Sequence, residues 1–502
     1  MNRIALPDGA SKGARGPAVL LDGFRPALAR IEDTFGLSER RAALVAVAAL
    51  GVVVVGVSAA TRLGILPEAA GLAAAFVAIL LSLRWPLLPL FAFVMLIPVE
   101  EVLVLGGGTL SRYAEILFIV AYAVPRVGKL TIRAMPVAAW GYVAWAILSL
   151  GWAIAPNETL LEIPVLVLLF ITAVVLAALI VERPTIVRPL LWAYSLTAAA
   201  TAALGVYGTL MSGAIAGAND RAGGLQDQNP AYFAAILLPA LVFSLFELVN
   251  GRQLVISSVI AGLTAAAIAA SGTRGAWVAV IVVVAVFIMP RLAPAKRLGA
   301  ILVIATAGLI ALQIPGLAPF LLERAETAVT TGGAGRTDIW SVGLTIYQSA
   351  PITGVGLADF PSAYTPERVR DSDVGVYSAN NGAFRAPHNI VIGTLGELGL
   401  IGLFLLTIFL LPLVLRRGWG PDAVMVQAAL ASLVITAFFL DVLNRKQLWL
   451  LAGIACGLLY LARVHSDREA AMAARRTILL PSSAAIDPSS TEVAGPLAPA
   501  GS

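Results

Sequence analysis

The sequence predicts an all-α polytopic membrane protein of about 12–14 transmembrane helices with one large extracytoplasmic loop. Hydrophobic residues make up 59% of the 502 residues, and charged residues only 13%. Apolar runs of about 17 to 25 residues recur along the chain, which is the length that a hydrocarbon layer of about 30 Å requires of a spanning helix. The basic residues gather in short connections between these runs, where they are typical of topology signals.

The apolar pattern gives about fourteen candidate spans. The third, fourth and tenth are the weakest, because they are short or interrupted by proline. The spans lie near 42–60, 66–83, 86–105, 111–125, 134–154, 159–181, 189–211, 230–249, 254–270, 275–290, 298–317, 389–415, 422–441 and 447–463. An even number of spans places both termini on the same side of the membrane.

Alternate connections carry most of the basic residues, and this bias predicts a cytoplasmic N-terminus. The connections predicted to be cytoplasmic contain Arg84, Arg126, Lys129, Arg133, Arg183, Arg188, Arg252, Arg291, Lys296, Arg297, Arg416 and Arg417. Arg445 and Lys446 break this trend: they either contact lipid phosphate groups or mark an error in the last two spans. Because the basic residues do not form one stripe, the net charge of +5 does not indicate a nucleic acid partner.

This topology divides the chain into segments. They are a cytoplasmic N-terminal segment at 1–41, a transmembrane bundle at 42–317, a large periplasmic loop at 318–387, C-terminal transmembrane helices at 388–463 and a cytoplasmic tail at 464–502. The loop is far longer than a tight helix connection, which indicates that it is folded and functional. The tail is rich in Ala, Ser and Pro and is expected to be disordered.

Arginines stand at the predicted outer face against the charge trend: Arg221, Arg274, Arg336 and Arg385. A shared anion explains them most simply, because a guanidinium is always charged and its planar fork of donors suits a phosphate or diphosphate. Interfacial snorkelling, or pairing with acidic residues of the large loop, is an equally open explanation for any one of them. For Arg274 the anion-binding interpretation is favoured, since this residue lies in the tight turn SGTRG with no acidic residue nearby in sequence.

His388 stands where the large loop re-enters the membrane, between Pro387 and Asn389. The proline favours a position at or near a helix N-terminus. There the positive end of the helix dipole and the charge of Arg385 would lower the pKa of the imidazole and keep it neutral, so that it can accept a proton. A histidine that only caps the helix or binds a loop carbonyl is the alternative.

The span after His388 carries glycines at every third position from Gly393 to Gly402, and one carboxylate, Glu397. This spacing gives a smooth surface that another helix, or a polyprenyl chain, can approach closely. A carboxylate at this depth is unfavourable unless it is paired or hydrated. Glu397 is therefore expected to support the site by binding a donor from another segment.

Motifs for nucleotide hydrolysis and zinc chemistry are missing: there is no Walker loop, no Rossmann fingerprint, no HExxH and no cysteine–histidine cluster. Cys456 is the only cysteine, which excludes internal disulfides and thiolate metal sites. The acidic pair Asp371 and Asp373 could bind a divalent cation, but no third ligand is evident and a solvated loop is favoured. We therefore predict no metal and no cofactor.

Two stretches of the sequence match motifs of a known family. One is His388-Asn389, followed after nine residues by Gly399-Leu400-Ile401-Gly402. The other is RTDIWSVGLTIYQSAPITGVGLADF, with matches at Arg336, Trp340, Pro351, Gly354, Gly356 and Phe360. Weaker matches are SGTRG around Arg274 and the stretch from Arg221 to Pro230. Together these residues resemble the O-antigen ligase family, which includes lipopolysaccharide O-antigen ligases, O-antigen and exopolysaccharide polymerases, and bacterial protein O-oligosaccharyltransferases.

The resemblance implies a membrane glycosyltransferase of the C-type fold. It implies transfer of a glycan from an undecaprenyl-diphosphate carrier to a hydroxyl of lipid A core or of a growing polysaccharide, at the periplasmic face of the bacterial inner membrane, without metal and with inversion. The implied catalytic residues are His388 as general base, with Arg274 and Arg336 on the diphosphate, and the substrate-binding residues are Arg221, Arg385 and Asn389.

Other functions stay open at this point. Ligase, polymerase and protein transferase share the same chemistry, and no residue separates them. The main rival outside this class is a flippase or transporter of polyprenyl-linked saccharide, which would require polar residues along a mid-membrane pathway. The notable charges instead gather on one face. A purely structural scaffold gives no reason for outward arginines beside a histidine.

Overall fold

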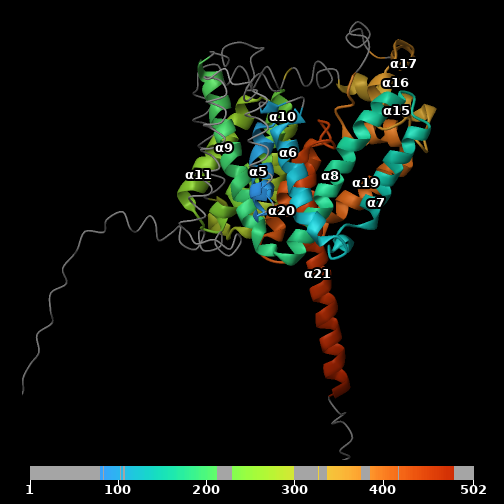
Figure 1. Ribbon diagram of the computed structural model, residues 1–502. Coiled ribbons are helices and arrows are strands. Elements are labelled where there is room, and N and C mark those ends of the chain that lie inside the picture. Colours follow the sequence, from blue (N-terminus) through green and yellow to red (C-terminus); the bar gives the residue numbers. More distant parts are fainter. Residues whose placement is uncertain are drawn as a thin grey trace, which may run out of the picture.

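The computed structural model describes residues 80–82, 84–101, 103–105, 108–211, 229–298, 326, 336–372, 374, 385–416 and 418–479. These residues form a helical bundle with one short hairpin, so the prediction of an all-α polytopic membrane protein is confirmed (Figure 1). Among them, 6 helices are long and apolar enough to cross a membrane, and shorter apolar helices accompany them. The N-terminal segment at 1–41, the span near 42–60 and nearly all of the spans near 66–83 and 298–317 lie outside the described residues.

The helices follow the predicted spans closely. Those before residue 212 are α5 (Leu88–Leu96), α6 (Leu110–Phe118), α7 (Val137–Leu148), α8 (Pro156–Glu182) and α9 (Val187–Met211). Those after it are α10 (Pro230–Val249), α11 (Leu254–Ala270), α12 (Arg274–Val283), α15 (Arg336–Ser349), α16 (Phe360–Ala363), α17 (Pro366–Asp371), α19 (Ile390–Leu415), α20 (Ala423–Thr436) and α21 (Lys446–Leu479). Strands β1 (Val104–Leu105) and β2 (Gly108–Thr109) pair antiparallel before α6. Tighter or wider turns extend α5 to Val99, α6 to Arg126, α7 to Gly151 and α12 to Arg291.

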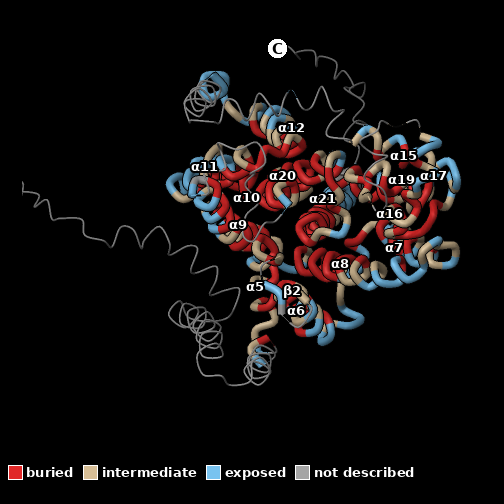
Figure 2. Tube along the Cα trace, turned by 90° about the horizontal axis from the view of Figure 1, so that it is seen from above, coloured by how far each residue is buried: buried red, intermediate tan, exposed pale blue. Residues whose placement is uncertain are grey.

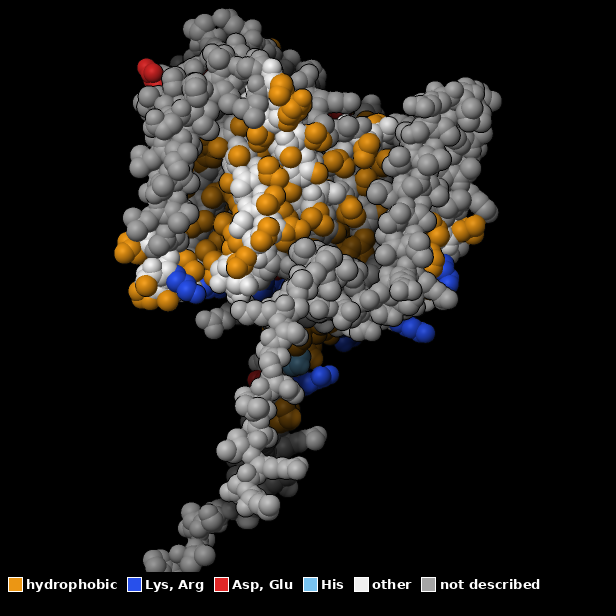
Figure 3. Space-filling model, turned by 90° about the vertical axis from the view of Figure 1, so that its left-hand side faces the viewer, with side chains coloured by type: hydrophobic (Ala, Val, Ile, Leu, Met, Phe, Trp, Pro, Cys, Tyr) orange, Lys and Arg blue, Asp and Glu red, His pale blue; other side chains and the backbone are white. Residues whose placement is uncertain are grey.

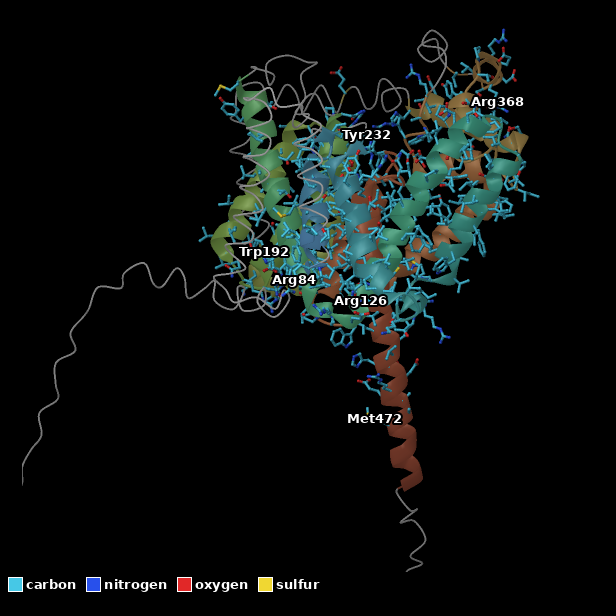
Figure 4. All side chains as sticks on the ribbon, viewed as in Figure 1. Arg84, Arg126, Trp192, Tyr232, Arg368 and Met472 are labelled. Carbon is cyan, nitrogen blue, oxygen red and sulfur yellow. The ribbon has the colours of Figure 1, made fainter. Side chains whose placement is uncertain are left out.

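The two ends of the bundle differ in charge and shape. One end, here called the basic end, includes Arg84 and Arg126 (Figure 4). The other, here called the loop end, carries α15, α16 and α17 (Figure 1). On the face between them apolar side chains are exposed, with Lys and Arg below (Figure 3). This distribution matches the positive-inside pattern of a multi-pass membrane protein.

Two predicted boundaries are wrong. The span near 86–105 ends early, since Pro98 lacks a backbone donor and the chain then turns into the hairpin. The last helix is longer than predicted, because α21 continues beyond the bundle to Leu479 (Figure 1). Residues 464–479 are therefore helical rather than part of a disordered tail, and their richness in Ala and Arg gives them a high intrinsic helix propensity.

Helices α8 and α21 pack at the centre of the bundle and are largely buried (Figure 2). A Cβ atom added at Gly453 would lie 2.8 Å from the carbonyl oxygen of Ala173, and one at Gly457 would lie 2.8 Å from that of Ala177. Small residues one turn apart on both helices let the two backbones approach this closely. This contact fixes the start of α21 at the loop end.

Helix α19 is broken at Gly399, whose φ of 65° and ψ of −163° are open almost only to glycine. The loop segment 351–356 lies in the break and takes up the backbone groups that it releases. Four backbone bonds join them: Leu400 N–H to the Pro351 carbonyl (2.9 Å), Ile401 N–H to the Ile352 carbonyl (3.4 Å), Val355 N–H to the Gly396 carbonyl (2.9 Å) and Gly356 N–H to the Glu397 carbonyl (2.9 Å). Irregular backbone at membrane depth is tolerated only where protein satisfies it in this way.

The glycines of α19 are covered by loop residues. Gly393 lies against Pro387, Gly396 lies against Phe360, and a Cβ atom at Gly399 would lie 2.3 Å from the carbonyl oxygen of Ile352. Close packing against protein, one of the two interpretations of the glycine spacing, is therefore found here, and α15 takes part in it, since its Gly343 receives the side chain of Ile392. Loop residues occupy the surface that the other interpretation assigned to a polyprenyl chain.

Two carboxylates, Glu397 and the buried Asp359, fasten the inserted segment from both sides. Glu397 accepts hydrogen bonds from the backbone N–H groups of Ala358 and Phe360, so its predicted supporting contact with another segment is present. Asp359 accepts from Ala155 N–H at 3.0 Å and from the Thr159 hydroxyl at 3.2 Å, which ties the segment to the start of α8. The α15–α17 unit also has its own small core of Ile339, Val342, Ile346, Val355, Phe360, Ala363, Tyr364 and Val369. The described part of the predicted 318–387 loop is thus folded.

Gly354 offers a test of the inserted segment. Its φ is 70°, and a Cβ atom would lie 2.2 Å from the carbonyl carbon of Glu397. We expect Gly354→Ala to destabilise the protein by about 2 kcal/mol or more and to lower its thermal unfolding temperature in detergent. Gly262→Ala in α11 is the matched control, since nothing lies within 4 Å of its added methyl group. Equal unfolding temperatures for the two variants would contradict the insertion.

Candidate functional site

Arg274 is the first residue of α12 and follows a tight turn from α11. Gly272 adopts a φ of 61°, and the Ser271 hydroxyl accepts a hydrogen bond from Thr273 N–H at 3.2 Å. The Thr273 hydroxyl donates to the carbonyl of Pro230, at the start of α10, at 3.1 Å. The small and hydroxylated residues of the SGTRG motif therefore hold the backbone of Arg274 at the loop end.

Arg336 is the first residue of α15 and is half-buried. Burial lowers the pKa of its guanidinium, and the positive charge of Arg274 lowers it further. An arginine nevertheless stays charged in proteins. No carboxylate in the described part of the chain forms an ion pair with Arg336. Two arginines from distant parts of the sequence therefore act on each other at one site.

His388 has a φ of 48°, which is uncommon for a residue with a side chain. Its Nδ1 atom is buried and has no hydrogen-bond partner among the described residues. The indole N–H of Trp340 in α15 donates to the Pro387 carbonyl at 3.2 Å, so α15 is tied to the residue just before the histidine. Backbone strain and an unsatisfied buried nitrogen at the same residue point to function rather than stability.

The pKa of His388 lies below its ordinary value of 6.5. Burial is the main cause, and the positive charges of Arg336 and Arg385 add to it. The imidazole is therefore neutral at pH 7, the state that the sequence predicted from the helix dipole and Arg385. The structure adds burial and Arg336 as causes, which required the fold to be known.

Asn389 caps α19 and attaches it to the segment that follows α20. Its Oδ1 accepts from Val391 N–H (2.8 Å) and Ile392 N–H (3.1 Å), and its Nδ2 donates to the Phe438 carbonyl (3.1 Å). Next to this carbonyl, Phe439 lies against Gly275 at the start of α12. The cap thus joins the histidine segment to the helix that carries Arg274. These bonds give Asn389 a positioning role, and its predicted contact with substrate stays a prediction.

The loop end thus gathers positive charge around one neutral base. Arg274 acts on Arg336, and both Arg336 and Arg385 act on His388. They come from the start of α12, the start of α15 and the segment before α19. Arg221 lies outside the described residues. Such a site can bind a polyanion and accept a proton from a group next to it.

A polar cluster at the start of α21 was missed from the sequence. The Lys446 ammonium donates to Glu100 (2.6 Å), Ser111 (2.6 Å) and Thr109 (3.0 Å), and Arg445 pairs with Glu101 at 3.1 Å. Neither basic residue therefore marks an error in the last two spans, since each has a carboxylate partner within the protein. The adjacent glutamates at the end of the third predicted span were the signal that could have found this cluster.

A comparison with family models matches residues 257–407 to the O-antigen ligase family. The matched region contains Arg274, Arg336, Arg385 and His388, so the charged site lies within it. A search of curated proteins finds no match. This match agrees with the resemblance identified from the sequence and covers its two main motifs up to residue 407, in a chain whose described part contains 6 helices long and apolar enough to cross a membrane.

Proposed function

We propose that the protein transfers a glycan from an undecaprenyl-diphosphate carrier to an acceptor hydroxyl at the periplasmic face of the bacterial inner membrane. The observation that carries this proposal is the gathering of charge around Arg336 and His388: the charge of Arg274 lowers the pKa of Arg336, and the charges of Arg336 and Arg385 lower the pKa of His388. Like charges held together in a half-buried site repel one another. A bound diphosphate attracts each of these positive charges and so outweighs their repulsion. The O-antigen ligase domain over residues 257–407 supports the same reaction class.

In the proposed reaction the arginines bind the diphosphate from two directions. Arg336 and Arg274 each present a planar fork of donors to its oxygens and stabilise the negative charge that grows as it leaves. His388 accepts the proton of the acceptor hydroxyl while the hydroxyl oxygen attacks the anomeric carbon. The bond from that carbon to the diphosphate oxygen breaks in the same step, so the configuration inverts. The guanidinium groups supply the positive charge, and the reaction needs no metal.

The proposed orientation follows from the two ends of the bundle. The basic end faces the cytoplasm, so the loop end and its site face the periplasm. The polyprenyl tail of the donor then lies in the bilayer beside the apolar face, with its diphosphate at the level of the arginines. The acceptor is a hydroxyl of lipid A core or of a growing polysaccharide, and it approaches from the aqueous side.

Removal of one arginine tests the diphosphate contact. We expect Arg336→Gln to reduce the transfer rate about a hundredfold or more, because a charge-assisted bond to the developing oxyanion is lost. The assay is transfer from a lipid-linked oligosaccharide by the purified protein in liposomes. Arg370→Gln in α17 is the control, since that side chain is 74% exposed, and it should keep wild-type rates. Wild-type transfer by Arg336→Gln would refute the assignment.

The pH profile tests the base. Only neutral His388 can accept a proton, so kcat/KM should rise with pH through the lowered pKa and level off at a lower pH than it would with an ordinary imidazole. Arg385→Gln removes one of the charges that lower this pKa. The pKa of His388 should then rise toward its ordinary value, and the acid limb of the profile should move to higher pH. An acid limb that stays in place would argue against His388 as the base.

The strained backbone at His388 separates stability from activity. Asparagine adopts a positive φ more readily than histidine, so His388→Asn should unfold at a temperature no lower than that of the wild type. Transfer should fall about a hundredfold or more, because the general base is gone. Thermal unfolding and the transfer assay on the same preparation decide this. A marked loss of stability would indicate a structural histidine instead.

A further inference from the structure

A polar cavity of about 300 Å³ lies at the loop end beside the start of α21. Residues of α6 and α8 and of the chain around the start of α21 line it, so it is distinct from the arginine site at α12 and α15. Its lining residues are Glu100, Glu101, Thr109, Arg112, Glu115, Glu162, Val165, Leu168, Leu169, Asn444, Arg445 and Lys446. Nothing in the proposed transfer step uses these residues.

Two residues that line the cavity carry buried polar atoms that lack partners. Glu115 is completely buried, and its Oε1 accepts from the Thr172 hydroxyl at 2.7 Å. Its Oε2 has no hydrogen-bond partner among the described residues, and neither does Nε of Arg445. Buried polar atoms are nearly always satisfied in native proteins, so an unsatisfied acceptor and an unsatisfied donor on residues that line one cavity point to a bound ligand.

The charges in the cavity almost cancel, which defines the kind of ligand. Glu100 pairs with Lys446 at 2.6 Å, and Glu101 pairs with Arg445 at 3.1 Å. What is left is two carboxylates, Glu115 and Glu162, with Arg112. An anion would be repelled by the two carboxylates, and a cation would be repelled by the arginine. A sugar ring fits both, because each of its hydroxyls can donate and accept, and its C–H faces suit the apolar wall that α8 provides.

The cavity is a neighbour of the arginine site. The guanidinium of Arg445 lies 3.7 Å from the ring centre of Tyr232, near the start of α10 (Figure 4). Two residues before Tyr232, the Pro230 carbonyl accepts the hydrogen bond from Thr273, which precedes Arg274. The cavity and the arginines thus lie on either side of the N-terminus of α10. A glycan that extends from a diphosphate at the arginines, or an acceptor beside it, could therefore reach the cavity.

We propose that this cavity is a saccharide site that holds one sugar ring of the glycan handled by the protein, through Glu115, Glu162 and Arg112. The proposal deepens the proposed function, since it rests on the protein acting on glycans. The sugar belongs either to the glycan on the donor or to the acceptor, and both share the same hydroxyl chemistry.

Direct binding gives the first test. The full-length protein in lipid nanodiscs is titrated with the free oligosaccharide that mild acid releases from the lipid-linked donor. We expect Glu162→Gln and Glu115→Gln to weaken binding about tenfold or more, since hydrogen bonds to a charged group are lost. Glu158→Gln is the matched control, one turn earlier on α8, exposed and outside the cavity. Arg336→Gln should bind the oligosaccharide like the wild type.

The competing outcomes are distinct. Equal affinity of the wild type and Glu162→Gln for the oligosaccharide would overturn the proposal. Displacement of the oligosaccharide by inorganic pyrophosphate would overturn it as well, because it would show that the oligosaccharide binds at the arginines. Thermal unfolding without ligand shows whether each variant is folded. If Glu115→Gln does not fold, Glu162→Gln decides alone.

Kinetics then identify the source of the sugar. In the transfer assay Glu162→Gln should raise the KM of one substrate about tenfold with little change in kcat: the KM of the acceptor if the cavity holds the acceptor, and that of the donor if it holds the donor glycan. No change in either KM would overturn the proposal. Absence of transfer by the wild type would instead refute the proposed function, while a loss of oligosaccharide binding in Glu162→Gln would still support a saccharide site.

Discussion

The need to satisfy backbone hydrogen bonds in an apolar environment governs this molecule. Helix α19 breaks at Gly399, and the released backbone groups would be costly to leave unpaired in a membrane. The segment 351–356 fills that break with its own backbone. A loop that is distant in sequence from the helix start thereby becomes a fixed part of the bundle, held further by the carboxylates of Glu397 and Asp359.

This insertion explains how the charged site is built. The segment before it is α15, which begins with Arg336, and the helix that receives it begins next to His388. Trp340 binds the Pro387 carbonyl, and Asn389 binds the Phe438 carbonyl near α12. Hydrogen bonds from side chains to the backbone therefore hold together groups that repel one another electrostatically. Such an arrangement lowers the stability of the folded protein, and it is typical of a site whose charges are neutralised when the substrate binds.

Much of the site could be named from the sequence, because its residue types are unusual in their context. Arginines at an outer face break the charge trend, and few structural roles explain a histidine that follows proline where the chain enters the membrane. The burial of His388 could not be predicted from the sequence, although burial is the main cause of its lowered pKa. The glycine spacing of α19 indicated close packing without identifying the partner, because the loop that covers these glycines comes from another part of the chain.

The sequence by itself determined the fold class, the positions of most spans and the resemblance to O-antigen ligase motifs, because hydrophobic length and local motifs are properties of contiguous residues. Tertiary structure alone decided the break in α19, the pairing of Arg445 and Lys446 with the adjacent glutamates, and the polar cavity at α8. Each of these depends on contacts between segments that are far apart in the chain. Such contacts are selected by packing and by the satisfaction of buried polar groups, which no local pattern records.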